Sequence, residues 1–170
     1  LPGTNIVGAP YTNGQWALPD YSDPQSTNYF IAYDDAADPQ APVVLEQVTY
    51  SQELYDGNDL FANNKFTPKT LGTYFVSGSM EVGLQSTPTN SRISLYLVTT
   101  NASGYGWNFM TDREGDAISS RESLSFAHIL YYTNASDSYF VSRSLDGGIY
   151  TTNMTRWFSA ILLSTNVVTP

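Results

Sequence analysis

The side chains of this sequence that could do acid–base or metal chemistry are almost all carboxylates. They form three groups: Asp34, Asp35 and Asp38; Asp56 and Asp59; Asp112, Glu114 and Asp116. Paired carboxylates can cleave glycosidic bonds, and clustered carboxylate oxygens can hold calcium. No group has the spacing of an EF-hand loop, so a solvated acidic loop is the simpler interpretation of each. Calcium is the alternative, and its candidate ligands are Asp56, Asp59, Asp112 and Asp116.

Histidine and cysteine chemistry is limited by count, because His128 is the single histidine and the chain has no cysteine. A Ser-His-Asp triad would have to use His128, which lies inside the apolar run Leu124–Tyr132, and the sequence has no Gly-x-Ser-x-Gly turn. Zinc held by His and Cys is excluded, since these two residue types cannot supply three ligands here. His128 is therefore interpreted as structural, and we expect no catalytic residue, no cofactor and no enzymatic activity.

A short segment from Gly104 to Phe109 combines two glycines with three aromatic residues. Interpreted as a loop, it would present Tyr105, Trp107 and Phe109 for stacking on sugar rings or for contact with a protein. The alternative is that these three rings pack into the core beneath the loop. The segment is the candidate ligand-contact loop of the chain.

Length and charge narrow the classes of partner. The chain has 170 residues and a net charge of −9 at pH 7, which suits one strongly acidic domain. Such a chain repels phosphate backbones and offers no basic patch to anionic lipids, so we expect no nucleic-acid partner. No stretch approaches 18 consecutive apolar residues, and we expect no membrane insertion.

The elements that must position these side chains begin after an N-terminal arm. Residues 1–28 are interrupted by Pro and Gly throughout, and Tyr11, Trp16 and Tyr21 recur every five residues within them. One interpretation is a flexible leader. The other is an extended arm whose three aromatics dock on a neighbouring subunit or surface, because exposed rings are unfavourable in a tail.

Residues 29–170 are predicted to form one all-β domain. No segment keeps apolar residues at helical spacing, whereas short runs rich in Tyr, Phe, Val, Ile and Thr lie between turn residues. This pattern is typical of a sandwich or jelly roll. The expected strands are Tyr29–Tyr33, Val43–Tyr50, Gly72–Val82, Ile93–Thr99, Leu124–Tyr132, Tyr139–Ser144 and Trp157–Leu163.

Two segments resemble the complement C1q/tumour necrosis factor superfamily. Asp56–Val76, DGNDLFANNKFTPKTLGTYFV, resembles its central signature of an Asn/Asp-rich loop followed by Phe, Pro, Gly, Tyr and a second aromatic. Trp157–Leu163, WFSAILL, resembles its closing strand. The resemblance implies a C1q/TNF-like jelly-roll sandwich that assembles as a homotrimer, as in viral and phage trimeric structural proteins.

The same resemblance implies which side chains form the trimer interface. It places four at the threefold axis: Phe75, Phe126, Phe158 and Leu162. It assigns positions of opposite parity to the sandwich core: Tyr74, Trp157, Ile161 and Leu163. The alternative for Phe75 and Phe158 is packing in the core.

The expected function is that of a non-enzymatic virion surface protein, such as a capsid decoration, fibre or spike knob. The chain has only two lysines, Lys65 and Lys69, no Cys, and many Asn, Ser, Thr and Tyr, which resembles viral structural proteins. Its partners would be two further copies of itself, a capsid or other virion protein reached through the arm, and a host-surface glycan. The alternative is an extracellular glycan-binding or adhesive trimeric module.

Overall fold

The computed structural model describes residues 11–12, 15–16, 28–35, 43–84, 91–115, 121–146, 150–151 and 155–165. Every regular element among these residues is a β-strand, which confirms the predicted all-β class. Within the same ranges, no helix is long and apolar enough to cross a membrane.

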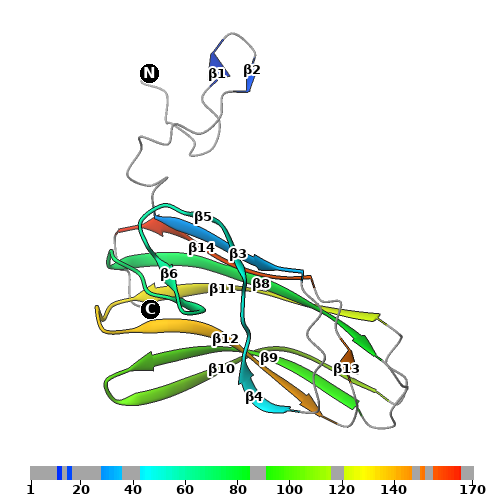
Figure 1. The fold of residues 1–170 in the computed structure, drawn as a ribbon. Helices are drawn as coiled ribbons and strands as arrows, with labels where there is room; N and C mark the ends of the chain where they lie inside the picture. The colour runs from blue at the N-terminus through cyan, green and yellow to red at the C-terminus, as the bar shows by residue number, and fades with distance from the viewer. Residues whose placement is uncertain are drawn as a thin grey trace.

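The strands form two antiparallel sheets that face each other as a sandwich (Figure 1). The first, called the β8 sheet, has the order β11-β8-β14-β3-β5, with β13 also pairing β8. Its strands are β3 (Tyr29–Asp34), β5 (Gln52–Asp56), β8 (Gly72–Leu84), β11 (Arg121–Tyr132), β13 (Tyr150–Thr151) and β14 (Arg156–Ser164).

The second sheet, called the β9 sheet, has the order β10-β9-β12-β7-β6, with β4 also pairing β12. Its strands are β4 (Val43–Gln47), β6 (Phe61–Ala62), β7 (Lys65–Phe66), β9 (Ser91–Asn101), β10 (Gly104–Gly115) and β12 (Ser138–Asp146). The chain passes repeatedly from one sheet to the other, so neighbours within a sheet are mostly distant in sequence. A small hairpin of β1 (Tyr11–Thr12) and β2 (Gln15–Trp16) forms a separate two-stranded sheet.

The Asn/Asp-rich loop of the sequence signature shapes the start of the β9 sheet. The two carboxylate oxygens of Asp56 accept hydrogen bonds from the backbone N–H groups of Leu60 and Phe61, at 2.7 and 2.9 Å. Asn63 and Asn64 then take positive φ values of 53° and 60°, which matches the two-residue turn that twists correctly between paired strands. The loop thereby delivers β6 and β7 to the core.

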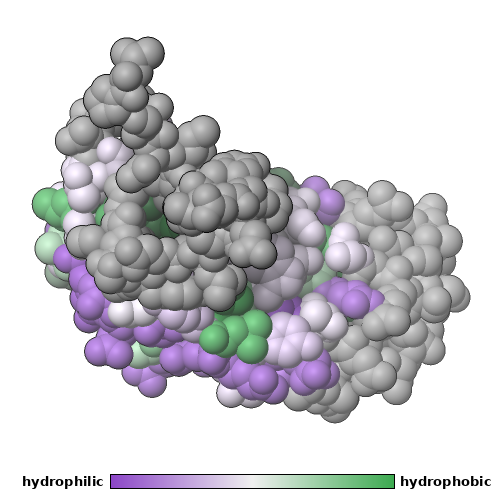
Figure 2. Space-filling view, turned by 90° about the horizontal axis from the view of Figure 1, so that it is seen from above, coloured by the Kyte–Doolittle hydropathy of each residue, from purple (hydrophilic) through white to green (hydrophobic). Residues whose placement is uncertain are grey.

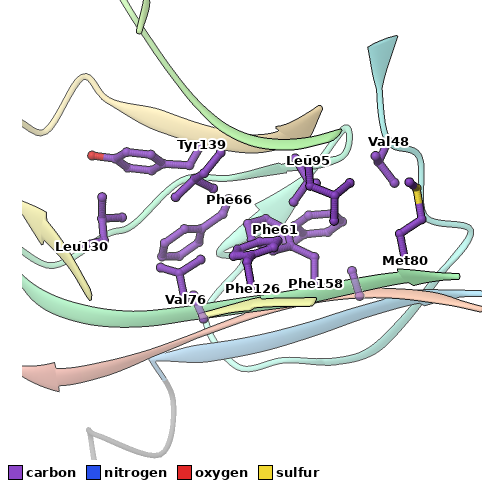
Figure 3. Packing of buried hydrophobic residues seen from close by; sticks show 14 of the residues in the cluster. Val48, Phe61, Phe66, Val76, Met80, Leu95, Phe126, Leu130, Tyr139 and Phe158 are labelled. Carbon is purple, nitrogen blue, oxygen red and sulfur yellow. The ribbon is translucent and has the colours of Figure 1, made fainter. Parts of the chain in front are cut away.

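Aromatic side chains dominate the interior between the sheets (Figure 3). Phe30 stacks on Phe61 with ring centroids 4.8 Å apart and meets the ring of Phe158 edge-on at 5.1 Å. Phe66 contacts Tyr74 edge-on at 5.4 Å. Interlocking rings of this kind contribute about 0.5–1.5 kcal/mol per pair beyond the burial of their surface.

In the closing strand, the structure exchanges the residues that we expected on the inner face with those that we expected on the outer face. Phe158 and Leu162 of β14 are buried between the sheets, whereas Ile161 and Leu163 are exposed and Trp157 is half-buried. Figure 3 shows Phe126 and Phe158 on the inner side of the β8 sheet. The expectation that Phe126, Phe158 and Leu162 lie at a trimer axis is therefore wrong, as is the expectation that Trp157, Ile161 and Leu163 fill the core.

A glycine makes room for Phe126 on the inner face of the β8 sheet. Phe126 and Phe158 are the register partners of Gly78 on its two sides, so all three share the inner face of the sheet. A Cβ on Gly78 would lie 2.7 Å from Cε1 of Phe126, which means that this ring occupies the space that the glycine leaves. The outward parity remains for Phe75, which is exposed as expected of an interface residue.

Candidate functional site

One candidate surface is the outward face of the β8 sheet. We call it the apolar face and define it by Tyr29, Phe75, Ile129, Tyr131, Ile161 and Leu163. The register places Ile129, Phe75, Ile161 and Tyr29 side by side across four neighbouring strands. Exposed hydrophobic side chains gathered on one sheet face are a mark of an interaction site.

The apolar face has a polar border on the same sheet. The hydroxyls of Ser77 and Ser159 are hydrogen-bonded at 3.0 Å, and Ser125 donates to Ser79 at 3.1 Å. In Figure 2, which looks onto the molecule from the side of the β8 sheet, the coloured surface in view has small hydrophobic areas among hydrophilic ones. An apolar centre with a hydroxyl border is the arrangement found in protein–protein interfaces.

The second candidate surface is the outward face of the β9 sheet, on the opposite side of the sandwich. We call it the aromatic row and define it by Tyr96, Tyr105, Trp107, Phe109 and Phe140. Tyr96 contacts Trp107 at 6.3 Å and Phe109 at 5.7 Å, and Tyr105 contacts Trp107 at 6.3 Å and Phe140 at 6.4 Å. Three of the rings, Tyr105, Trp107 and Phe109, are exposed.

The segment that carries these three rings is strand β10 and not a loop, which corrects the sequence interpretation. It pairs with β9 from Gly104 to Gly115, and it lies at the edge of the sheet. Core packing of the rings is also contradicted, because Tyr105, Trp107 and Phe109 expose 66%, 45% and 50% of their surface. Alternation along a strand explains the spacing, since every second residue points to the same face.

One cation and two hydroxyl side chains lie beside the aromatic row. Lys65 lies beside it, with Nζ 5.7 Å from the centroid of the Phe140 ring. The ion pair between Arg92 and Asp112, at 2.8 Å, belongs to the other end of β9 and β10. Tyr105 is the register partner of Thr100 on β9, and Thr100 is the register partner of Ser138 on β12. Both neighbours carry a hydroxyl group.

The acidic residues proposed as calcium ligands have other partners where the structure describes them. Asp56 receives the two backbone N–H groups of its loop, and Asp112 pairs with Arg92. Asp59 is exposed with a φ of 51°, and Asp116 lies outside the described residues. Among the described ranges, no three His, Cys, Asp or Glu side chains gather as a metal site would require.

The remaining candidates are placed as follows. His128 is half-buried and shares the inward parity of Phe126 and Leu130, in keeping with its structural interpretation. In the arm, Tyr11 and Trp16 are register partners in the β1–β2 hairpin, while Tyr21 lies outside the described residues. The docking of these arm aromatics stays a prediction.

Two buried arginines at one end of the sandwich were missed by sequence reasoning. Arg156 donates from Nη2 to Asp34 and from Nε to the carbonyl of Thr49, both at 2.6 Å. Arg143 donates to Glu46 at 2.8 Å. Burial raises the pKa of Tyr50 well above its ordinary value, against the opposing effect of Arg156 and then Arg143. These ion pairs fix strand ends and engage the carboxylates of Asp34 and Glu46.

Comparison with known proteins identifies the fold. No protein-family model matches the sequence, and no curated protein does. The globular domain of zebrafish complement 1qA protein matches with a TM-score of 0.61 at 19% identity, over 82% of this chain and 98% of that one. Murine APRIL at pH 5.0 matches with a TM-score of 0.52 at 13% identity, over 79% and 99%. The chain therefore has the C1q/TNF-like jelly-roll fold, which confirms the expectation from Asp56–Val76 and Trp157–Leu163.

Proposed function

We propose that the chain is a non-enzymatic display domain that assembles as a homotrimer through the apolar face. The observation that carries this proposal is the row Ile129, Phe75 and Ile161, exposed side by side on one side of the sandwich and continued by the half-buried Tyr29. Two isoleucines and a phenylalanine left in water on one sheet face are unfavourable for a monomer. Association of like faces around an axis removes them from water in every subunit.

The stacked pair of Tyr29 and Tyr55 strengthens the same proposal. Their rings are 4.0 Å apart and inclined by only 10°, so the end of the row that reaches β5 is stiff. A surface whose side chains are already held in place loses less conformational freedom on association. The C1q/TNF-like fold is the further support, because the sequence resemblance implies a trimer of this domain.

We further propose that the trimer is a virion surface component, a capsid decoration, fibre or spike knob, fastened through the N-terminal arm. The support is compositional: a net charge of −9, only two lysines and a Pro/Gly-rich residue 1–28 segment. Acidic surfaces keep densely displayed copies apart from one another. The expected partner of the arm is a capsid or other virion protein, and no metal is needed for assembly.

A second candidate function is that of an extracellular adhesive trimer that binds glycans. The aromatic row favours it, because Tyr105, Trp107 and Phe109 are exposed side by side on the face opposite to the apolar face. Attachment to a host surface would combine the two proposals in one molecule.

The solution mass of the purified chain tests the assembly proposal. Light scattering, with and without a calcium chelator, should give a mass near three times 18.7 kDa in either buffer. A monomer at micromolar concentration contradicts the trimer. Dissociation by the chelator contradicts the expectation that assembly needs no metal. Attachment through the arm is tested separately by deleting residues 1–28. The shortened chain should still form a folded trimer but should no longer attach to its particle.

A further inference from the structure

We propose that the aromatic row is a binding platform for a neutral oligosaccharide. This inference rests on the proposed function in its second, glycan-binding form, and it names the ligand class and the residues that would hold it. Tyr105, Trp107 and Phe109 project from alternate positions of β10, and the strand lies at the edge of its sheet. The three rings are exposed on the outward face of this strand.

The rings are held in place before any ligand arrives. Val98 lies beside Trp107 as its register partner and is fully buried, and Phe140 on the next strand is almost fully buried. The edge-on contacts of Tyr96 with Trp107 and Phe109 orient both rings. A prearranged aromatic surface binds with a smaller loss of side-chain freedom than a mobile loop would.

The length of the row suits a chain of sugars. Tyr105 and Phe109 are four residues apart on a strand, so the three rings extend over roughly 14 Å at about 3.4 Å per residue. Flat apolar faces of sugar rings stack on aromatic side chains, and their hydroxyls can reach the neighbouring Thr100 and Ser138. An extended oligosaccharide would cover the rings in succession, whereas one monosaccharide covers a single ring.

Charge decides between sugars and nucleic acid as the occupant. Nucleobases also stack on exposed aromatic rings, but their phosphates must be neutralised by several basic side chains. The chain has a net charge of −9, and in the part of the chain that the structure describes Lys65 is the cation that contacts the row. The same charge repels acidic glycans, which leaves neutral sugars as the class that fits.

Area decides between sugars and a protein partner. The exposed fractions of Tyr105, Trp107 and Phe109 are 66%, 45% and 50%, which at roughly 200 Å² per ring is about 300 Å² in total. A stable protein–protein interface needs about 800 Å² from each partner. The row is large enough for an oligosaccharide and too small to support a protein complex without further contacts.

Placement on the β9 sheet makes the platform compatible with assembly. The apolar face belongs to the β8 sheet on the other side of the sandwich, so a trimer built on that face would carry three rows pointing away from its axis. Three linked sites increase the apparent affinity for a displayed glycan by about 100-fold or more over one site. Weak binding by each row would therefore suffice for attachment.

The test uses the full chain on an array of immobilised neutral oligosaccharides built from glucose, mannose, galactose, fucose and N-acetylhexosamines, with sialylated and uronic-acid glycans beside them. Saturable binding to at least one neutral glycan is expected, followed by titration of that free oligosaccharide. Trp107→Ala and Tyr105→Ala should each weaken the titrated affinity at least tenfold. Leu54→Ala, which removes an exposed side chain from β5, is the matched control and should leave it unchanged.

The outcomes separate this inference from the assembly proposal. A trimer that binds no neutral glycan, binds only acidic ones, or binds equally well after Trp107→Ala and Tyr105→Ala overturns the platform and leaves the assembly intact. A monomer whose binding depends on these two residues supports the platform and overturns the assembly. If Trp107→Ala fails to fold, Trp107→Leu and Tyr105→Ala still decide the question, because the Tyr105 ring is the most exposed of the three.

Discussion

Replacing Phe75 by Ala should weaken the trimer without unfolding its subunits. Phe75 exposes 38% of its surface, which for an aromatic side chain of roughly 200 Å² is about 75 Å² and about 2 kcal/mol of burial per copy at ~25 cal/mol/Å². A trimer that covers all three copies would lose about 6 kcal/mol. The association constant should therefore fall roughly 10,000-fold.

Sedimentation equilibrium over a dilution series measures this loss directly. The native chain should remain trimeric at concentrations where Phe75→Ala is mostly monomeric, while the circular dichroism of the two proteins should agree. Phe75→Glu should be monomeric at every accessible concentration, because a buried interface would leave three carboxylates close together without partners. Tyr105→Ala is the control, since Tyr105 is more exposed but lies on the opposite sheet.

Two results would refute the reasoning about Phe75. If Phe75→Glu remains a soluble trimer, the apolar face is not the interface. If Phe75→Ala instead lowers the stability of an isolated subunit by several kcal/mol, the Phe75 ring is part of the subunit core and not of an interface. Equal weakening by Tyr105→Ala would place the interface on the β9 sheet.

Three further predictions test the interior. Phe158→Ala should lower the free energy of unfolding by about 3–5 kcal/mol, because it empties the centre of the aromatic core. Arg156→Met should cost about 3–5 kcal/mol by leaving Asp34 buried without its charge partner, and adding Asp34→Leu should restore most of it. Burial raises the pKa of Tyr74 from 10.0 to about 12, so its stabilising effect should be full below pH 10 and lost as the pH rises to 12.

Urea denaturation checks the first two predictions, and thermal unfolding between pH 8 and pH 12 checks the third. If Phe158→Ala is a soluble and stable monomer, Phe158 belongs to the trimer interface and not to the core. Failure of the second substitution to rescue Arg156→Met would show that the hydrogen bond from Arg156 to the Thr49 carbonyl matters more than the ion pair. The stability of Tyr74→Phe should fall less steeply as the pH rises, although this variant loses the hydrogen bond that the Tyr74 hydroxyl donates to the carbonyl of Thr70.

Strand β8 shows what the sequence was able to predict. Its residues alternate cleanly, with Tyr74, Val76 and Met80 on the buried side and Phe75 and Ser77 on the other, and the structure has this parity. Alternation of apolar with small or polar side chains determines which face of a strand is buried. The fold class followed from several such strands together with the loop and closing-strand motifs.

Strand β14 shows why the interface prediction failed. Its sequence Trp-Phe-Ser-Ala-Ile-Leu-Leu places large apolar residues on both faces, so hydrophobicity alone does not choose between them. The choice is made by tertiary partners: Arg156 is held inside by Asp34, and Phe158 packs edge-on against Phe30. A one-residue shift in parity exchanges every side chain between core and surface.

The β10 strand was missed for a related reason. Gly104 and Gly106 at its start are typical of turns, which outweighed the alternation of Tyr105, Trp107 and Phe109 with small or polar residues. The β9–β10 pairing, and the support that Val98 gives to Trp107, come from contacts that the order of residues does not reveal. The residue types of the candidate ligand site were therefore predictable, whereas the rigid platform that presents them was not.

The two sheets give the domain two kinds of exposed hydrophobic surface that differ in what they can bind. The apolar face mixes aliphatic and aromatic side chains over four strands, which suits a broad protein contact. The aromatic row is narrow, edge-placed and bordered by hydroxyls, which suits a sugar chain. Because they lie on opposite sides of one core, a change on either face should leave the other unaffected. Phe75→Ala should therefore lower the apparent affinity for an immobilised glycan through loss of multivalency, while the affinity for the free oligosaccharide stays unchanged.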